Sequence, residues 1–108
     1  MNSMVSVWTD HELAVAREVF ERAHGRAIQA LIASVQRQSE ELDSVDGLWQ
    51  LHDFLSIQRH RIEGNFDFRL EGILFVFAGL VKEGLLEPSE LKDLDDEKQA
   101  KIMAMARF

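Results

Sequence analysis

The chain has 108 residues, of which 46% are hydrophobic, and this predicts one folded domain rather than a disordered segment. It contains no cysteine, which excludes disulfides, iron–sulfur clusters and thiolate zinc sites. With 12 Lys and Arg against 19 Asp and Glu, the net charge is −7, so we expect no binding to the phosphate backbone of a nucleic acid.

Neither the N-terminus nor the most apolar segment has a targeting or membrane pattern. Residues 1–7 lack a basic start and a sustained apolar stretch, so we expect no signal peptide. The most apolar run, residues 72–81, has about half the length that crosses a bilayer, so we expect no membrane insertion. These features predict a cytoplasmic protein. One proline and six glycines favour helices over strands with tight turns.

A capping box predicts the start of the first helix. Thr9 and Glu12 have the spacing in which each side chain accepts the other's backbone N–H. Apolar residues at spacings of three and four then predict a helix from Asp10 to about Gln38, which is roughly 44 Å at 1.5 Å per residue. The periodic apolar positions are Leu13, Ala16, Phe20, Ala23, Ala27, Leu31 and Val35.

Two more helices are predicted from their flanking residues. With Asp46 as N-cap, the second helix should run from Gly47 to Glu63 and end at Gly64. With Asp67 as N-cap, the third should continue to Glu83 and stop at Gly84. The expected core stripe of the third helix consists of Leu70, Ile73, Leu74, Phe77, Leu80 and Val81.

The C-terminal part predicts two short helices. Pro88 suits the first position of one, and the acidic run 95–97 suits the start of a last helix toward Arg107. The predicted fold is all-α, with a long helix and a return helix forming an elongated stalk beside a compact group of three shorter helices. We expect a single domain over residues 1–108. Within it, residues 1–8 form a flexible N-terminus, 9–63 a helical hairpin for dimerisation, and 64–108 a helical head.

The unequal helix lengths predict self-association. The second helix spans roughly 26 Å, far less than the 44 Å of the first, so it cannot cover the apolar residues of its neighbour. The terminal helices or a second copy of the chain must cover the remainder. We therefore expect a homodimer, with the two copies antiparallel.

The second predicted helix has two different faces. Leu48, Leu51, Leu55 and Ile62 fall on one arc and form the expected core stripe. The neighbouring arc carries Trp49, His52, Asp53, Ser56, Arg59 and His60. A tryptophan and an arginine on a mostly polar strip are residue types that anchor protein interfaces.

Several functions compete for this strip. A shared metal ion is disfavoured because His52 and His60 are eight residues apart, about 12 Å along the axis. Catalysis by Ser56 with either histidine lacks a water-excluding pocket on an exposed helix face. Intrahelical pairing is also poor, because Asp53 and His60 are seven residues apart. The preferred interpretation is a protein interface, without metal, cofactor or small-molecule substrate. Three rivals remain: an adaptor or chaperone-like dimer with an unrelated client, an enzyme built on Ser56, and a purely structural dimer.

The same helix carries a long and compositionally unusual motif. Trp49-Gln50-Leu51-His52-Asp53-Phe54-Leu55-Ser56, followed by Arg59-His60, Ile62-Glu63-Gly64, Asp67 and Arg69, closely resembles the fluorescence recovery protein family. The later segments Phe75-Val76-Phe77-Ala78, Glu83-Gly84-Leu85 and Asp96-Glu97-Lys98-Gln99 match as well. The resemblance extends from about Trp8 to Phe108.

This resemblance implies a non-enzymatic cyanobacterial regulator that forms antiparallel dimers. It would bind the photoactivated orange carotenoid protein, mainly through that partner's C-terminal domain. It would speed the return to the inactive orange form and promote release from the phycobilisome, ending photoprotective quenching. The residues carried over for dimer contacts and partner binding are Leu48, Trp49, His52, Asp53, Arg59 and His60. Phe75 and Lys101 match a second contact region, to which we add Phe68.

The residue pattern also bears on that second region. Phe75 points nearly opposite to the core stripe of its helix, alongside Phe68 and Lys82. Gly72 and Gly79 have no side chains and should leave a shallow surface between these larger residues. The two phenylalanines are expected to form one docking patch.

Overall fold

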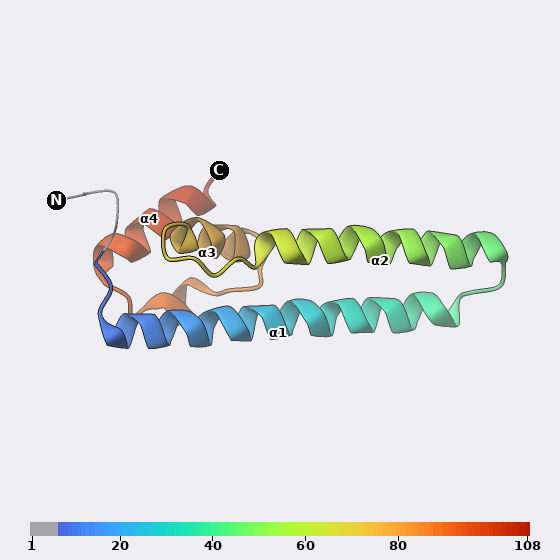
Figure 1. The fold of residues 1–108 in the computed structure, drawn as a ribbon, viewed down its shortest axis with the longest axis horizontal. Helices are drawn as coiled ribbons and strands as arrows, with labels where there is room; N and C mark the ends of the chain where they lie inside the picture. The colour runs from blue at the N-terminus through green and yellow to red at the C-terminus, as the bar shows by residue number, and fades with distance from the viewer. Residues whose placement is uncertain (1–6) are drawn as a thin grey trace.

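The structure, a computed structural model, describes residues 7–108 and is built from helices connected by short loops (Figure 1). The elements in chain order are α1 (Asp10–Glu40), α2 (Val45–Asn65), α3 (Ile73–Lys82), the 3₁₀ helix η1 (Pro88–Leu91) and α4 (Asp96–Ala106). No strand occurs within residues 7–108. The predicted all-α fold, with two long helices and three short ones, is confirmed.

The molecule is elongated, measuring 59 × 25 × 24 Å. In Figure 1, α1 and α2 run antiparallel as a hairpin, and their connection forms the tip at one end. At the other end, α3, η1 and α4 gather against the N-terminal half of α1. We call the hairpin the stalk and the opposite end the head.

The capping box at the start of α1 is confirmed. The Thr9 hydroxyl accepts the Glu12 backbone N–H at 3.0 Å, and the Glu12 carboxylate accepts the Thr9 backbone N–H at 3.2 Å. Two orphan donors at the helix N-terminus are thereby satisfied. The helix ends at Glu40, two residues beyond the predicted Gln38.

The predicted start of α2 is wrong by two residues. Ser44, rather than Asp46, is the N-cap, because its hydroxyl accepts the Gly47 backbone N–H at 3.0 Å. Asp46 instead lies in the first turn, where a negative charge complements the helix dipole. The helix also continues past Gly64 to Asn65.

The predicted start of α3 is wrong by a larger margin. Residues 66–72 are not helical, and α3 begins only at Ile73, with Gly72 as N-cap. Asp67 caps nothing in this structure; its carboxylate accepts a hydrogen bond from Arg69 at 3.1 Å. The physical reason lies in tertiary packing, because Phe66 and Phe68 both turn onto Phe20 of α1.

The later boundaries follow the prediction. Gly84 ends the third helix with φ of +76°, a left-handed conformation that glycine adopts without the steric cost of a Cβ. Pro88 stands at the first position of η1. Asp95 caps α4 by accepting the Lys98 backbone N–H at 2.8 Å.

The buried core lies entirely in the head and the adjoining half of α1. Its members are Ala16, Val19, Ala23, Ile73, Phe77, Ala78, Leu80, Leu86, Leu91, Leu94 and Ile102. No residue from His24 through Gly72 is buried. The predicted core stripe of α2 is therefore wrong within one copy of the chain: Leu48 and Leu55 are exposed, and Leu51 and Ile62 are only half-buried. Leu70, assigned to the core stripe of the third helix, is also exposed and precedes α3.

The predicted flexible N-terminus mostly falls outside the described residues, which begin at Val7. Val7 and Trp8 contact Lys98 of the head: its ammonium donates to the Val7 carbonyl at 2.6 Å and lies 5.0 Å from the Trp8 ring centre. The boundary between residues 63 and 64 stays a prediction. The core spans this boundary, because residues of α1 before it pack with residues of the head after it.

Candidate protein-binding surface

The outer face of α2 presents the predicted strip of Trp49, His52, Asp53, Ser56, Arg59 and His60, which we call the α2 strip. All six residues are exposed, and the Trp49 side chain is 61% exposed. A large aromatic left this open on a regular helix adds nothing to the core of its own chain. The strip is therefore free to contact another protein.

The charges of the α2 strip are held only by weak local pairs. His52 Nδ1 lies 3.4 Å from an oxygen of the neighbouring Asp53, and Arg59 Nε donates to Glu63 at 3.4 Å. All four side chains are well exposed, and exposed pairs contribute little to stability. The guanidinium of Arg59 can thus exchange Glu63 for a carboxylate on another chain.

The geometry of the strip argues against a metal centre or a catalytic site. Among the described residues, no group of three or more His, Cys, Asp or Glu side chains could hold a metal ion. Ser56, His52 and His60 all face open water, so they do not form the enclosed setting that nucleophilic catalysis needs. Within residues 7–108, none of the helices is long and apolar enough to cross a membrane.

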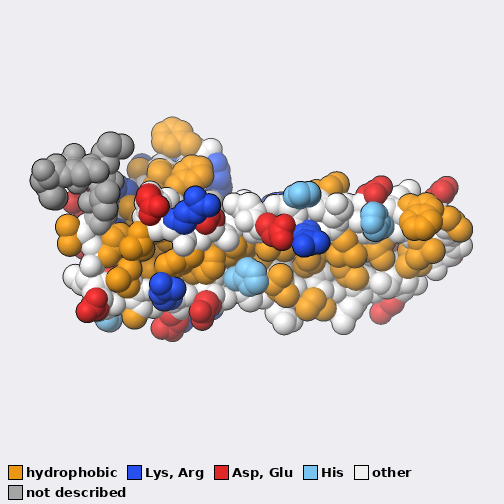
Figure 2. All heavy atoms as spheres, in the orientation of Figure 1, with side chains coloured by type: hydrophobic (Ala, Val, Ile, Leu, Met, Phe, Trp, Pro, Cys, Tyr) orange, Lys and Arg blue, Asp and Glu red, His pale blue; other side chains and the backbone are white. Residues whose placement is uncertain are grey.

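An apolar surface borders the α2 strip along the stalk. Leu48, Leu55 and Ile62 follow one another at intervals of seven residues and so form a line along α2. Ile32 of α1 is also exposed. Figure 2 shows a band of hydrophobic side chains along the boundary between α1 and α2, flanked by charged residues and histidines. We use the name stalk seam for the line of Leu48, Leu55 and Ile62 that borders the α2 strip.

A second exposed region lies on α3. Phe75 is 73% exposed, beside a hollow that Gly72 and Gly79 help to line. This agrees with the predicted shallow surface. Lys101 of α4 is half-exposed and pairs only with Glu97, one turn away, at 3.2 Å.

Phe68 does not belong to the Phe75 patch, so that part of the prediction is wrong. Its ring packs edge-on against Phe20 of α1, with the centroids 5.2 Å apart, and the Arg17 guanidinium lies 4.8 Å above it. The prediction assumed a helix at Phe68, whereas residues 66–69 form no regular secondary structure and the Phe68 ring packs toward α1.

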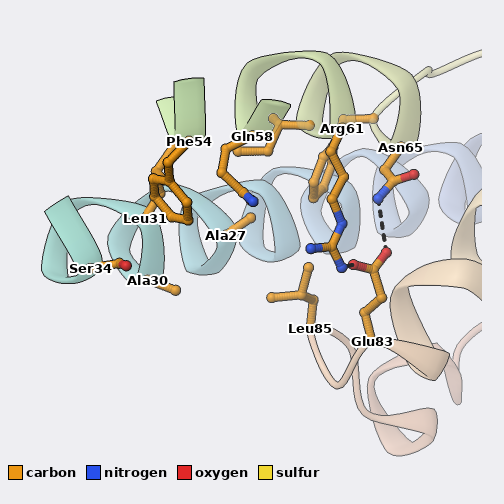
Figure 3. A pocket seen from close by; sticks show the side chains of 12 residues that line it. Ala27, Ala30, Leu31, Ser34, Phe54, Gln58, Arg61, Asn65, Glu83 and Leu85 are labelled. Carbon is orange, nitrogen blue, oxygen red and sulfur yellow. Dashed lines mark hydrogen bonds and ion pairs between the residues drawn. The ribbon is translucent and has the colours of Figure 1, made fainter. Parts of the chain in front are cut away.

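Two sets of ionic contacts fix the stalk to the head. In Figure 3, Arg61 and Asn65 of α2 both reach Glu83, which follows α3. The Asn65 amide donates to Glu83 at 2.9 Å, while Arg61 forms an ion pair with the same carboxylate. These residues border a hollow of about 320 Å³ between the two stalk helices, the hollow drawn in Figure 3. Arg61 therefore connects the stalk to the head, whereas Arg59 pairs only with Glu63 of its own helix.

The other set of contacts joins α1 to η1. Arg26 donates to both oxygens of Glu90 at 2.8 and 2.9 Å, and Arg22 donates to Glu90 at 3.0 Å. The hydrogen bond from Arg26 outweighs the effect of burial and lowers the pKa of Glu90 to about 2. Glu90 thus stays ionised across the physiological range.

A buried ionic cluster joins the start of α1 to the start of α4. Lys98 is 3% exposed, and its ammonium donates to Asp95 at 2.7 Å and to Glu12 at 3.3 Å. Burial by itself lowers the pKa of Lys98, but the hydrogen bonds to Asp95 and Glu12 outweigh it and raise the pKa above its usual value. The backbone N–H of Asp95 also donates to Glu12, at 2.9 Å.

No local sequence pattern indicates this cluster. The capping-box spacing indicates only a local role for Glu12, and nothing near residue 12 in the sequence indicates a partner 86 residues away. The short spacing of Asp95 and Lys98 indicates at most an exposed pair.

Comparison with known proteins gives consistent matches over nearly the whole chain. The family model described as photoprotection regulator fluorescence recovery protein matches residues 8–106. The fluorescence recovery protein of Synechocystis sp. (strain ATCC 27184 / PCC 6803 / Kazusa) is 46% identical over 101 residues, covering 94% of this chain and 93% of that protein.

Solved structures match equally well. The Fremyella diplosiphon fluorescence recovery protein has a TM-score of 0.92 at 40% identity, covering 94% of this chain and 100% of that one. The structure of the Synechocystis sp. PCC 6803 protein has the same TM-score and coverage, at 45% identity.

Proposed function

The chain belongs to the fluorescence recovery protein family of photoprotection regulators, which are not enzymes, and on that premise we propose that it binds the photoactivated orange carotenoid protein. It contacts mainly the C-terminal domain of that partner and accelerates its return to the inactive orange form. It also promotes release of the partner from the phycobilisome, which ends photoprotective quenching. The encounter takes place in the cytoplasm, at the phycobilisome.

The observation that carries the proposal is the exposed α2 strip. No residue of α2 is buried, although the helix contains a tryptophan, several leucines and an arginine without a strong local partner. A helix that contributes nothing to the core of its chain, yet carries interface residue types, supports a role in recognition. Trp49, His52, Asp53, Arg59 and His60 are the residues to which we assign it.

The mechanism is differential binding between two states of the partner. A protein that binds surfaces exposed only in the opened partner shifts the equilibrium between the opened and the compact partner. The size of that shift cannot exceed the difference between its affinities for the two states. To accelerate reclosure, it must bind the transition state for closing more tightly than the opened state, and then release the compact product. The net charge of −7 steers the encounter toward a basic patch, an attraction that salt weakens.

We further propose that the active molecule is an antiparallel homodimer. The absence of buried residues from His24 through Gly72 supports it, because the stalk seam remains uncovered in one copy. Leu48, which is 48% exposed near the tip, contributes to this interface.

The head supplies a second contact in this proposal. Phe75 and Lys101 are both accessible, one apolar and one cationic, and neither is needed by the core. Phe68 has no direct part, because it packs on α1.

The direct test follows the dark decay of the photoactivated carotenoid protein from red to orange with and without this protein. We expect faster decay in its presence, and a weaker effect with Arg59→Ala. A decay rate unchanged by a stoichiometric amount of the folded protein contradicts the proposed function.

A further inference from the structure

The hollow drawn in Figure 3 is bordered by three parts of the chain that are fixed to one another. We call it the junction hollow. Helix α1 supplies small side chains, among them Ala27 and Ala30, while α2 supplies Phe54 and the turn after α3 supplies Leu85. Arg26 holds this turn in place, because its guanidinium donates to the Leu85 carbonyl at 2.9 Å. The hollow is therefore formed before any ligand arrives, as is usual for small-molecule sites.

The junction hollow lies on a different side of the hairpin from the stalk seam. Phe54 lines the hollow and precedes the seam residue Leu55 by one position, which is a rotation of about 100° around the helix. On α1, Ala30 lines the hollow and is rotated by about 200° from the exposed Ile32. Ile62 borders both surfaces. A second copy on the seam therefore leaves most of the hollow open.

Two polar side chains of α2 face the junction hollow. In Figure 3, the ends of Gln58 and Arg61 extend from α2 toward α1 and Leu85. The amide of Gln58 offers both a hydrogen-bond donor and an acceptor. A guanidinium has five N–H donors, and Arg61 uses one terminal nitrogen for Glu83. The hollow thus combines apolar walls with donors that converge from one helix.

The charges around the junction hollow favour a neutral ligand. The Glu83 carboxylate compensates the charge of Arg61 and also accepts a hydrogen bond from Asn65. An anion would share Arg61 with this carboxylate, in a chain whose net charge is already −7. A cation would be repelled by the guanidinium. A neutral carbonyl oxygen accepts from the remaining donors without either repulsion.

We propose that the junction hollow binds a small neutral molecule that has an apolar ring and a carbonyl oxygen. The oxygen accepts hydrogen bonds from Arg61 and Gln58, and the ring lies against Ala30, Leu31 and Phe54. The volume of about 320 Å³ is at the lower end of the range for ligand pockets, which suits a molecule of roughly one or two rings. Because this ligand contacts the stalk and the head together, its binding stabilises their junction.

A matched series of probes tests the proposal on the unmodified chain. Acetophenone, benzoate and α-methylstyrene have nearly the same planar outline, but they present a neutral carbonyl, a carboxylate and no oxygen, respectively. Each has about nine non-hydrogen atoms, so a Kd of about 1 mM is expected for the probe that fits. Titration is followed by the NMR signals of the Ala27 and Ala30 backbone amides and of the Gln58 side-chain amide. Acetophenone should bind at least about 5-fold more tightly than either of the other two.

Two variants test the position of the site and its charge. Ala30→Leu should abolish the acetophenone shifts by filling the hollow, and the chain should still fold because Ala30 is exposed. The matched control is Ala14→Leu, which makes the same change at an exposed position of α1 about 24 Å away. Glu83→Gln leaves Arg61 without its compensating charge, so benzoate should bind about 5- to 10-fold more tightly than to the unmodified chain. Far-UV circular dichroism verifies that the variants remain folded.

The outcomes decide the proposal independently of the proposed function, because none of the measurements involves the carotenoid protein. Equal or tighter binding of α-methylstyrene overturns the hydrogen bond to the ligand, and a preference of the unmodified chain for benzoate overturns its neutrality. Unshifted signals at several millimolar acetophenone, or shifts that persist in Ala30→Leu, overturn the site itself. The expected order of the three probes, its loss in Ala30→Leu and its retention in Ala14→Leu support the proposal.

Discussion

Replacing Lys98 by Met should destabilise the head more than any other single change to a charged side chain. The ammonium is buried and serves the carboxylates of Glu12 and Asp95 together with the Val7 carbonyl. Removing one member of a buried ion pair costs about 3–5 kcal/mol. Glu12 keeps its hydrogen bonds from two backbone N–H groups, and Asp95 is half-exposed to water, so we expect the lower end, about 3 kcal/mol.

Urea unfolding followed by far-UV circular dichroism, at fixed protein concentration, measures this loss. For a domain of this size, about 3 kcal/mol corresponds to a fall in Tm of roughly 12–24 °C. The matched control is Lys101→Met, one turn further along α4, whose pair with Glu97 is exposed and should contribute less than about 1 kcal/mol.

A double variant separates charge from packing. In Glu12→Gln/Lys98→Met the buried carboxylate is neutral, so part of the stability should return relative to Lys98→Met alone. If the stability of Lys98→Met lies within about 1 kcal/mol of that of the unmodified chain, the buried cluster does not stabilise the head.

Three further predictions concern the ionic contacts and the turn after α3. The pKa of Glu90 falls from its ordinary 4.5 to about 2 on folding, so its contribution is complete above pH 4.5 and is lost as the pH falls toward 2. Glu90→Gln should cost about 2–3 kcal/mol at neutral pH, and its difference from the unmodified chain should shrink in acid titrations of unfolding; a constant difference from pH 7 to pH 2 would count against the pairing. Arg59→Ala should weaken partner binding or dimerisation with little change in monomer stability, whereas Arg61→Ala should loosen the junction of stalk and head. Calorimetry combined with a pull-down of the photoactivated partner distinguishes the two, and equal effects on binding would contradict the ranking. Gly84→Ala should destabilise the chain by about 1 kcal/mol, because φ is +76° there and a Cβ strains the backbone in that conformation. A Tm equal to that of the unmodified chain would contradict this backbone strain.

The sequence predicts helix boundaries well where local chemistry decides them. Thr9 and Glu12 satisfy one another within a single turn, so the start of α1 is correct. Ser44 and Asp46 are both able to cap α2, and local rules do not rank them. Asp67 fails as a cap because Phe66 and Phe68 pack on Phe20, a contact between segments more than 40 residues apart.

Apolar periodicity locates a face of a helix without stating what covers that face. The pattern Leu48, Leu51, Leu55 and Ile62 is regular, yet α2 has no buried residue. In α3 the same kind of pattern does mark the core, at Ile73, Phe77 and Leu80. The exposed α2 strip is predictable, because polar residues and tryptophan alternate there with helical spacing. The Glu12–Lys98 contact is not, because it depends on how α4 returns to the start of α1.

The concentration of buried residues at one end of the molecule has a consequence for its motions. Backbone amides open locally with free energies that follow the density of buried contacts around them. Amides of the head should therefore exchange with solvent deuterium slowly, at rates set by global unfolding, while those from His24 through Gly72 exchange through smaller openings. If a second copy covers the stalk, its protection rises with protein concentration and that of the head does not. The part of the stalk away from the head then becomes fully ordered only when two copies associate. Assembly and the last stage of folding are in that case one event.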